Sequence, residues 1–353
     1  MPDTSDNGVL DEGLSRLAGT GPEFRGGLSN HGPMAAEALV RLGRADAVEH
    51  WLDGYLKKLD PAPRPAGPVT GGTWREALGA LNRVADWEAY LRVQLAEEPW
   101  RDVFARWWPR LLPGVAAAAT HGVIRTAHAA RSLAAAEAAG AETAGRRDEL
   151  ARGLAYWAAS YLELPGRPRA AGDRELRAAI GALPVDESAP EAGLITTQLA
   201  ARLPGLPGFE DAIAGLRPPA DPADGLRDLG AAFAGVFLRY GRTRPIALLH
   251  AVTAPVAARS VLPLLPAGIA RPTHDSLWQV AAGLYAVYSG GVTPEPLPAG
   301  PAPSPDDAAD RAVAAGDEHA IKLTEACLRL HAETPDPVFL HAAARASELL
   351  GGA

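Results

Sequence analysis

Residues 119–128 read ATHGVIRTAH, and they lie within an alanine-rich run that covers residues 115–138. Pro113 and Gly114 precede this run, and no proline interrupts it. Alanine is the strongest helix former, and a preceding proline and glycine are typical of the place where a helix begins. The run therefore predicts one long, buried helix around which the rest of the chain is arranged.

Three polar side chains share one side of this predicted helix. At 3.6 residues per turn, His121, Arg125 and His128 fall on a single stripe. Polar groups on an apolar helix need partners, and a lone buried histidine most often finds them in a carbonyl or a carboxylate of the core. Gly122 interrupts a good helix former, which indicates that another group approaches the helix closely there.

The composition favours helices throughout. The chain has 353 residues and 47% hydrophobic content, enough for one large or two ordinary domains. Alanine and leucine are abundant, no internal repeat occurs, and no stretch has a convincing strand pattern. The predicted fold is all-α, a single large domain of roughly a dozen helices with a buried polar, histidine-containing site.

Charge and cysteine content exclude several classes of protein. The formal net charge of −8 argues against nucleic acid as a partner, because phosphate binding needs a basic face. The single Cys327 excludes disulfide frameworks and cysteine-based metal sites, which suits a reducing cytoplasm. We found no leader and no apolar run of about 18 residues, so we expect a cytoplasmic protein without a membrane segment.

The chain divides by composition into a short beginning and one long body. Residues 1–27 are predicted to be an N-terminal segment that is partly flexible, and residues 28–353 a single helical domain. Within that domain, residues 166–222 form a loop-rich cover and residues 290–305 a linker rich in proline, glycine and alanine. The stretch from Asp306 to Leu330 is predicted to be one helix.

The histidines are the main candidates for functional residues. His31, His121, His128, His250 and His319 have apolar or small neighbours, whereas the other four are predicted at surface or cap positions, namely His50, His274, His331 and His341. Five imidazoles on four predicted helices are typical of a metal site in a helical protein. Nucleotide-binding glycine motifs and nucleophile elbows are absent. Buried tryptophans usually belong to a core, although Trp107, Trp157, Trp278 and Tyr285 could instead line a pocket for a flat ligand.

Several segments, in this order, resemble the questin oxidase family of oxygenases that open rings of aromatic polyketides. The resemblance covers about residues 28–343 and rests on these stretches: SNHGP (29–33), WREALG (74–79), Asp86-Trp87, Pro99-Trp100, THGVIRTAH (120–128), LLHAVT (248–253) and DEHAIK (317–322). Members have been described as Baeyer–Villiger-type oxidases and as all-helical enzymes with non-haem iron.

The resemblance implies a ligand set for Fe(2+). His31, His121, His250 and His319 would be the imidazole ligands, and Lys322 would be a ligand carboxylated on its amine. A desolvated lysine loses its proton readily, so it can take up carbon dioxide and then offer oxygen atoms to a metal.

Two residues of the central stripe are the predicted catalytic residues. Arg125 would hold a phenolate or superoxide, and His128 would either replace one of the four histidine ligands or form a hydrogen bond to a ligand. The predicted substrates are an aromatic polyketide and dioxygen, with an external reductant such as NADPH because no dinucleotide motif is present. The sequence does not decide the oligomeric state, and a homodimer is one option.

Two other functions remain open on the sequence. The chain could be a metal-independent or NADPH-assisted Baeyer–Villiger-type monooxygenase of the same substrate class, in which histidines act as bases. It could also be a non-catalytic helical binding protein whose histidines belong to the core.

Overall fold

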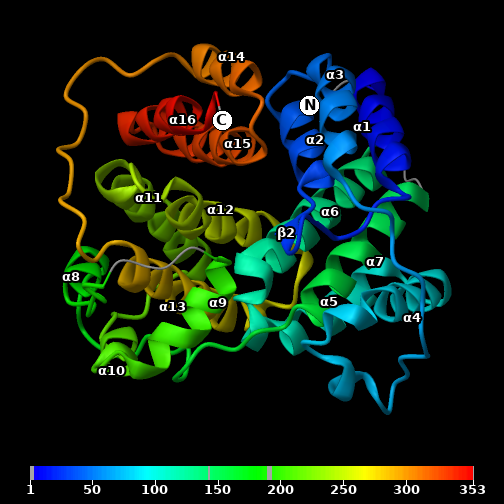
Figure 1. Ribbon diagram of the computed structural model, residues 1–353, viewed down its shortest axis with the longest axis horizontal. Helices are drawn as coiled ribbons and strands as arrows, with labels where there is room; N and C mark the ends of the chain where they lie inside the picture. The colour runs from blue at the N-terminus through cyan, green and yellow to red at the C-terminus, as the bar shows by residue number, and fades with distance from the viewer. Residues whose placement is uncertain (1–3, 142–143, 189–192, 353) are drawn as a thin grey trace. The chain divides into compact units, whose positions relative to one another are not determined.

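The computed structural model describes residues 4–141, 144–188 and 193–352. Within these ranges the protein is all-α, with sixteen α-helices and one two-stranded sheet (Figure 1). The sheet is an antiparallel hairpin of β1 (Glu23–Phe24) and β2 (Leu28–Ser29). The predicted all-α fold class is confirmed, with more helices than the sequence indicated.

The chain forms two compact units. Unit 1 contains Met1–Leu162 with Pro263–Leu265, and unit 2 contains Glu163–Leu262 with Pro266–Ala353. The single domain predicted for residues 28–353 stays a prediction, and each unit is described here by itself.

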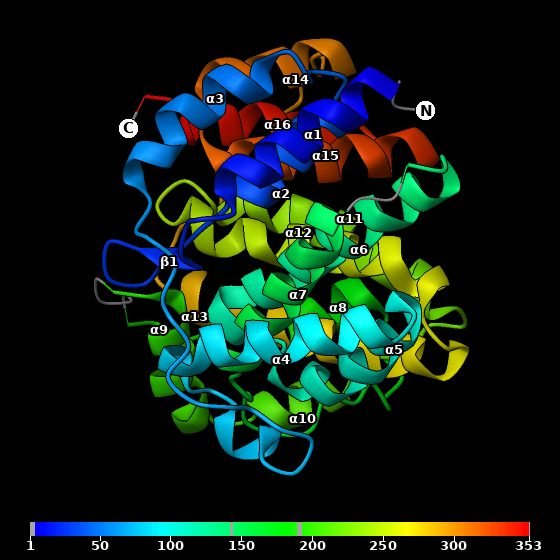
Figure 2. The same cartoon turned by 90° about the vertical axis from the view of Figure 1, so that its right-hand side faces the viewer.

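Unit 1 is built on packed pairs of helices. Helix α6 packs against α7 and α2, and α4 also packs against α7 (Figure 2). The seven helices of this unit are α1 (Thr4–Leu17), α2 (Gly32–Arg41), α3 (Ala47–Tyr55), α4 (Val84–Glu97), α5 (Trp100–Leu111), α6 (His121–Ala138) and α7 (Ala144–Ala159).

Tryptophans fill the core of unit 1. Trp107 meets Trp74 and Trp87 edge to face, with ring centroids 5.2 and 5.4 Å away. Trp108 meets Trp157 in the same way at 5.1 Å. Indole rings prefer this edge-to-face geometry, and the indole N–H of Trp157 donates to the Gly114 carbonyl. These rings therefore fix how α5 and α7 pack.

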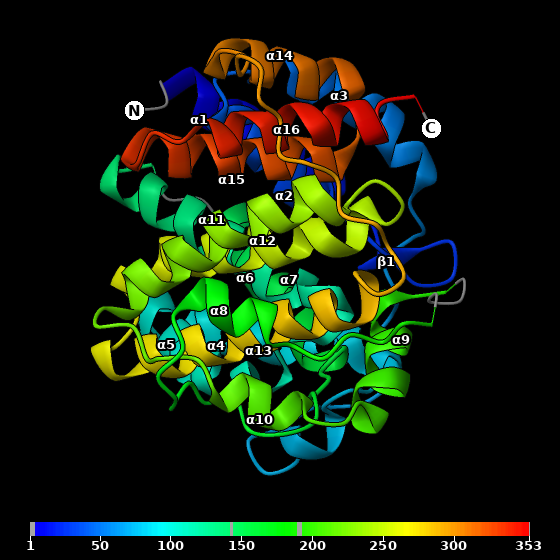
Figure 3. The same cartoon turned by 90° about the vertical axis from the view of Figure 1, so that its left-hand side faces the viewer.

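The long helices of unit 2 pack against one another in pairs, some of which are distant in sequence. Helices α14, α15 and α16 pack together, α16 contacts α11, α15 contacts α12, and both α11 and α12 contact α13 (Figure 3). Its helices are α8 (Leu176–Gly181), α9 (Ile195–Arg202), α10 (Phe209–Ala214), α11 (Pro222–Tyr240), α12 (Pro245–Val261), α13 (Ala270–Tyr288), α14 (Pro305–Ala315), α15 (Glu318–Glu333) and α16 (Pro337–Leu350).

The central helix of unit 2 is very apolar. Among the described residues, the segment Pro245–Leu264 is long and apolar enough to cross a membrane, which differs from the expectation that no such apolar run occurs. Of its 18-residue window, 78% is buried inside the protein. A buried core helix of a soluble protein has the same character.

The predicted helix over residues 115–138 is wrong at its start. Helix α6 begins at His121, and Ala118, Ala119 and Thr120 before it have left-handed backbone angles, with φ of 46, 55 and 72°. Alanine and threonine give no local signal for this conformation, which the sequence pattern therefore could not reveal.

The helix predicted from Asp306 to Leu330 is also wrong, because it is two helices. Gly316 ends α14 with a φ of 67°, and the Asp317 carboxylate then accepts from the main-chain N–H groups of His319 and Ala320. A left-handed glycine followed by an aspartate cap is the usual way to end one helix and begin another.

The ends and loops of the chain contain more helix than expected. The polar N-terminal segment forms α1, whose Leu10, Leu14 and Leu17 are buried. The loop-rich stretch 166–222 contains the short helices α8, α9 and α10, while residues 290–304 have no helix. Residues 1–3 and 189–192, which these predictions include, lie outside the described residues.

Candidate functional site

Unit 1 brings His31 and His121 together. Their ring centroids lie 4.4 Å apart with the ring planes at 43°, and both side chains are buried. His31 is the residue before α2, where its main-chain N–H donates to the Tyr55 hydroxyl, and His121 is the first residue of α6. Both imidazoles therefore lie at the N-terminus of a helix.

The ring of His121 is oriented by the main chain. Its Nδ1 atom lies 2.5 Å from the carbonyl oxygen of Ala118. A carbonyl oxygen can only accept, so the ring carries its proton on Nδ1 and its lone pair on Nε2. Histidine ligands of metals are usually oriented in this way by a second hydrogen bond.

Unit 2 brings His250 and His319 together. Their ring centroids lie 5.6 Å apart with the planes at 87°. The Nδ1 atom of His250 lies 2.6 Å from the Ile246 carbonyl oxygen, which again places the lone pair on Nε2. Burial, together with the charges of Lys322 and His319, holds the pKa of His250 well below its usual range. His250 is therefore a neutral imidazole at neutral pH.

His319 lies in the first turn of α15 beside two carboxylates. The side chains of Asp317, Glu318 and His319 each offer one ligand atom within 4.8 Å of the others, a grouping that could hold a metal ion. Asp317 Oδ1 lies 3.5 Å from His319 Nδ1. Carboxylate oxygens and imidazole nitrogens together suit iron, zinc or manganese.

Lys322 lies one turn after His319 and is buried, with 1% of its surface exposed. Among the residues that the structure describes, no group hydrogen-bonds to its Nζ atom. Burial lowers the pKa of Lys322 to about 8, against the opposing effect of Glu318 and Asp317. A buried amine that is partly neutral and lacks a partner fits a lysine that becomes carboxylated.

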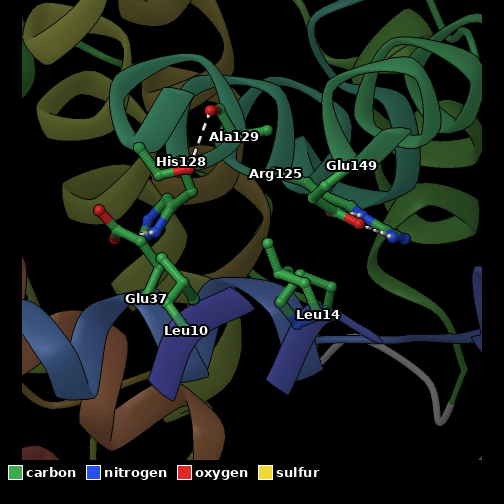
Figure 4. Close-up of a pocket in the computed structure, with 9 residues that line it drawn as sticks. Leu10, Leu14, Glu37, Arg125, His128, Ala129 and Glu149 are labelled. Atoms are coloured by element: carbon green, nitrogen blue, oxygen red, sulfur yellow. Dashed lines mark hydrogen bonds and ion pairs between the residues drawn. The ribbon is translucent and has the colours of Figure 1, made fainter. Parts of the chain in front are cut away.

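The two predicted catalytic residues line one small cavity of unit 1. Arg125 and His128 of α6 line this cavity together with Leu10 and Leu14 of α1, and in Figure 4 the Arg125 side chain extends to Glu149. The cavity has a volume of about 10 Å³, close to the space that one water molecule requires. It is too small for an aromatic substrate as it stands.

Arg125 is already engaged in a buried ion pair. Its Nε and Nη2 atoms donate to the two carboxylate oxygens of Glu149, over 2.6 and 2.9 Å. The negative charge of Glu149 neutralises the guanidinium, and the pair joins α6 to α7. The predicted contact of Arg125 with a phenolate or superoxide stays a prediction.

Glu37 of α2 is the partner of His128, and it was not predicted from the sequence. Its Oε2 atom lies 3.0 Å from His128 Nδ1 (Figure 4). Both of its carboxylate oxygens also accept from Arg131. Burial raises the pKa of Glu37, but Arg131, His128 and Arg41 outweigh it and hold the pKa well below the usual range. A lone carboxylate in the apolar run 34–40 was the available signal.

Other expectations are settled by the packing. Gly122 does mark a close approach, since a Cβ atom there would lie 2.8 Å from Trp157 Cα.

The prediction that His274 lies at a surface or cap position is wrong, because His274 is buried on α13, with Nδ1 2.8 Å from Asp275 Oδ1. Trp107, Trp157 and Trp278 are fully buried core residues of their units, whereas Tyr285 is partly exposed.

No protein-family model matches this chain, and no curated protein matches it. The resemblance to the questin oxidase family therefore stays a prediction.

Proposed function

We propose that this chain is a non-haem iron oxygenase that inserts oxygen into a quinone- or quinol-type aromatic polyketide and cleaves a carbon–carbon bond. The observation that carries the proposal is the orientation of two imidazoles: His121 and His250 each place Nδ1 on a main-chain carbonyl oxygen. Histidine ligands of metals are usually oriented in this way, with Nδ1 on a main-chain oxygen and the lone pair on Nε2. The substrate class rests on the sequence resemblance.

The proposed ligands are the imidazoles of His31, His121, His250 and His319, with Lys322 as a carboxylated ligand. The Lys322 amine has a pKa of about 8, so roughly a tenth of it is neutral at pH 7 and can add carbon dioxide. The resulting carbamate would supply anionic oxygen to the ion. Bound ferrous iron would supply the binding and activation of dioxygen.

The chain's own residues would handle the protons of the reaction. His128, held by Glu37 through Nδ1, can exchange a proton at Nε2. Arg125 would neutralise the charge of a bound phenolate only in part, because its guanidinium is already paired with Glu149. Electrons beyond those of a quinol substrate would come from an external reductant such as NADPH.

Metal analysis tests the proposal directly. Protein purified without chelator or affinity tag should contain about one iron per chain. The variants His121→Ala and His250→Ala should lose it while keeping the helical circular dichroism. His274→Ala is the matched control, because His274 is equally buried but belongs to neither histidine pair. An iron-free protein after anaerobic ferrous loading, or equal loss in the control, would overturn the proposal.

A second candidate is the metal-independent monooxygenase, and one observation favours it. The buried Glu37–His128 pair is the arrangement that orients a histidine as a general base. Such a base would deprotonate a phenol for direct reaction with dioxygen. Oxygen uptake by chelator-treated protein, abolished by His128→Gln and unaffected by His250→Ala, would select this candidate. A protein with neither metal nor oxygen uptake would be the non-catalytic binding protein.

A further inference from the structure

The turn before His121 has an unusual backbone. Ala118, Ala119 and Thr120 are consecutive and all left-handed, and the described residues contain only one other non-glycine residue with positive φ, Arg25. In this conformation Cβ crowds the following carbonyl oxygen, so it normally occurs as single residues and mainly as glycine. Three in a row without glycine persist only where the surrounding structure enforces them.

The turn is not explained by its own contacts. Thr120 is β-branched, fully buried, and makes no capping hydrogen bond to α6. Its hydroxyl oxygen has no hydrogen-bond partner in the part of the chain that the structure describes, and burying an unpaired hydroxyl group lowers the free energy of unfolding. Hydrogen bonds of the Thr120 side chain therefore do not account for this conformation.

The turn provides two hydrogen bonds to His121 from a single carbonyl group. The Ala118 carbonyl oxygen accepts from the main-chain N–H of His121 and also from its ring at Nδ1. One oxygen thus fixes the start of α6 and the orientation of the imidazole. Because Nδ1 and Nε2 lie on opposite sides of the ring, fixing the first sets the direction of the second.

The close packing of α6 keeps this start from shifting. Gly122 lies so close to Trp157 of α7 that a Cβ atom would meet its Cα and Cβ atoms at 2.8 Å. Helix α6 therefore cannot slide to relieve the strained turn without losing this contact.

We propose that the left-handed turn Ala118–Thr120 is a positioning element that orients His121 for metal binding. The inference rests on the proposed function. Strain before α6 is tolerated because it places the Ala118 carbonyl where the ring needs it. His250 obtains the same contact from Ile246 within its own helix, and it should not respond to changes in the turn.

The test uses paired substitutions of Ala118, which is the least buried residue of the turn. Glycine adopts φ of 46° readily, so Ala118→Gly should keep the turn, whereas the β-branched side chain in Ala118→Val disfavours it. Ala134→Val is the matched control, because Ala134 is also half-buried but lies within the right-handed part of α6.

Two measurements decide the outcome. In Co(II) titrations of the full chain, Ala118→Val should weaken binding by about tenfold or more, while Ala118→Gly and Ala134→Val stay close to the wild type. In metal-free protein, nitrogen NMR should show His121 protonated at Nδ1 in the wild type and in Ala118→Gly, and a mixture of tautomers in Ala118→Val.

The failures are distinguishable. If the wild type binds no Co(II), or if His121→Ala binds it equally well, the proposed function fails, and the NMR result alone decides whether the turn orients the ring. If His121→Ala loses Co(II) but Ala118→Val behaves like Ala134→Val in both measurements, the inference about the turn is overturned.

Discussion

Arg125 and Glu149 form a two-point ion pair inside unit 1, with Nε 2.6 Å from Oε1 and Nη2 2.9 Å from Oε2. Both side chains are buried, with 5% and 6% of their surfaces exposed. We expect Glu149→Gln to lower the free energy of unfolding by about 3–5 kcal/mol, because it leaves a buried guanidinium without its counter-charge. Urea denaturation measures this loss.

The double variant Arg125→Met with Glu149→Leu is the control for that prediction. It removes both charges, so it should be clearly more stable than either single variant. A loss below about 1 kcal/mol in Glu149→Gln would instead mean that the pair is not structural. Arg125 would then be the better choice for a substrate contact.

The sequence predicted most of the regular helices and the apolar surroundings of His31, His121, His250 and His319, and all four are buried. Periodicity and apolar neighbours were sufficient for this, because both depend on helical spacing and burial. They did not predict that His31 lies beside His121 in unit 1 or that His250 lies beside His319 in unit 2.

What the sequence could not give depends on tertiary structure. The left-handed turn at 118–120 is built from residues that favour right-handed helix, so packing overrides propensity there. The partners Glu149 and Glu37 come from other helices, and only the folded chain brings them to Arg125 and His128. The break at Gly316 was readable in the sequence as a glycine before a capping aspartate, and was passed over.

Lys322 should make stability depend on alkaline pH. Its folded pKa of about 8 is depressed, whereas an unfolded lysine titrates near 10.4. Between these two pKa values the unfolded state binds more protons than the folded state, so the free energy of unfolding rises with pH. Below pH 8, burying the protonated amine lowers the free energy of unfolding by about 3 kcal/mol. Lys322→Met should stabilise metal-free, carbonate-free protein by about 1–3 kcal/mol at pH 7, and less at pH 10. If the variant were less stable than the wild type at pH 7, burial of the Lys322 amine would not be destabilising, and the prediction would be wrong.

Glu37 should contribute to acid sensitivity. Its folded pKa lies below the unfolded value of about 4.3, so its contribution is present above that pH and is lost as the pH falls further. Glu37→Gln should cost about 3–5 kcal/mol at pH 7, because Arg131 and His128 lose their shared carboxylate. The difference from the wild type should shrink towards pH 3 in urea denaturation. A difference that is independent of pH would mean that packing, not charge, is lost.

Gly122 should be intolerant of even one added methyl group. In Gly122→Ala the new Cβ atom would lie 2.8 Å from Trp157 Cα, so α6 and α7 must separate. We expect a loss of about 1–3 kcal/mol. Gly235→Ala in α11 is the control, because nothing lies within 4 Å of its Cβ position, and it should gain about 0.5–1 kcal/mol from helix propensity. Thermal denaturation of the two variants compares them, and equal behaviour would contradict the close approach.

The tryptophan core of unit 1 has a spectroscopic consequence. Of the chain's 8 tryptophans, only Trp278 belongs to unit 2, so intrinsic fluorescence reports almost entirely on unit 1. Far-ultraviolet circular dichroism, in contrast, reports on the helices of both units. Coincident unfolding curves from the two signals would mean that the chain melts as one cooperative body, and separated curves would mean that the halves melt independently. An unmodified protein thus carries a built-in reporter that distinguishes its two halves.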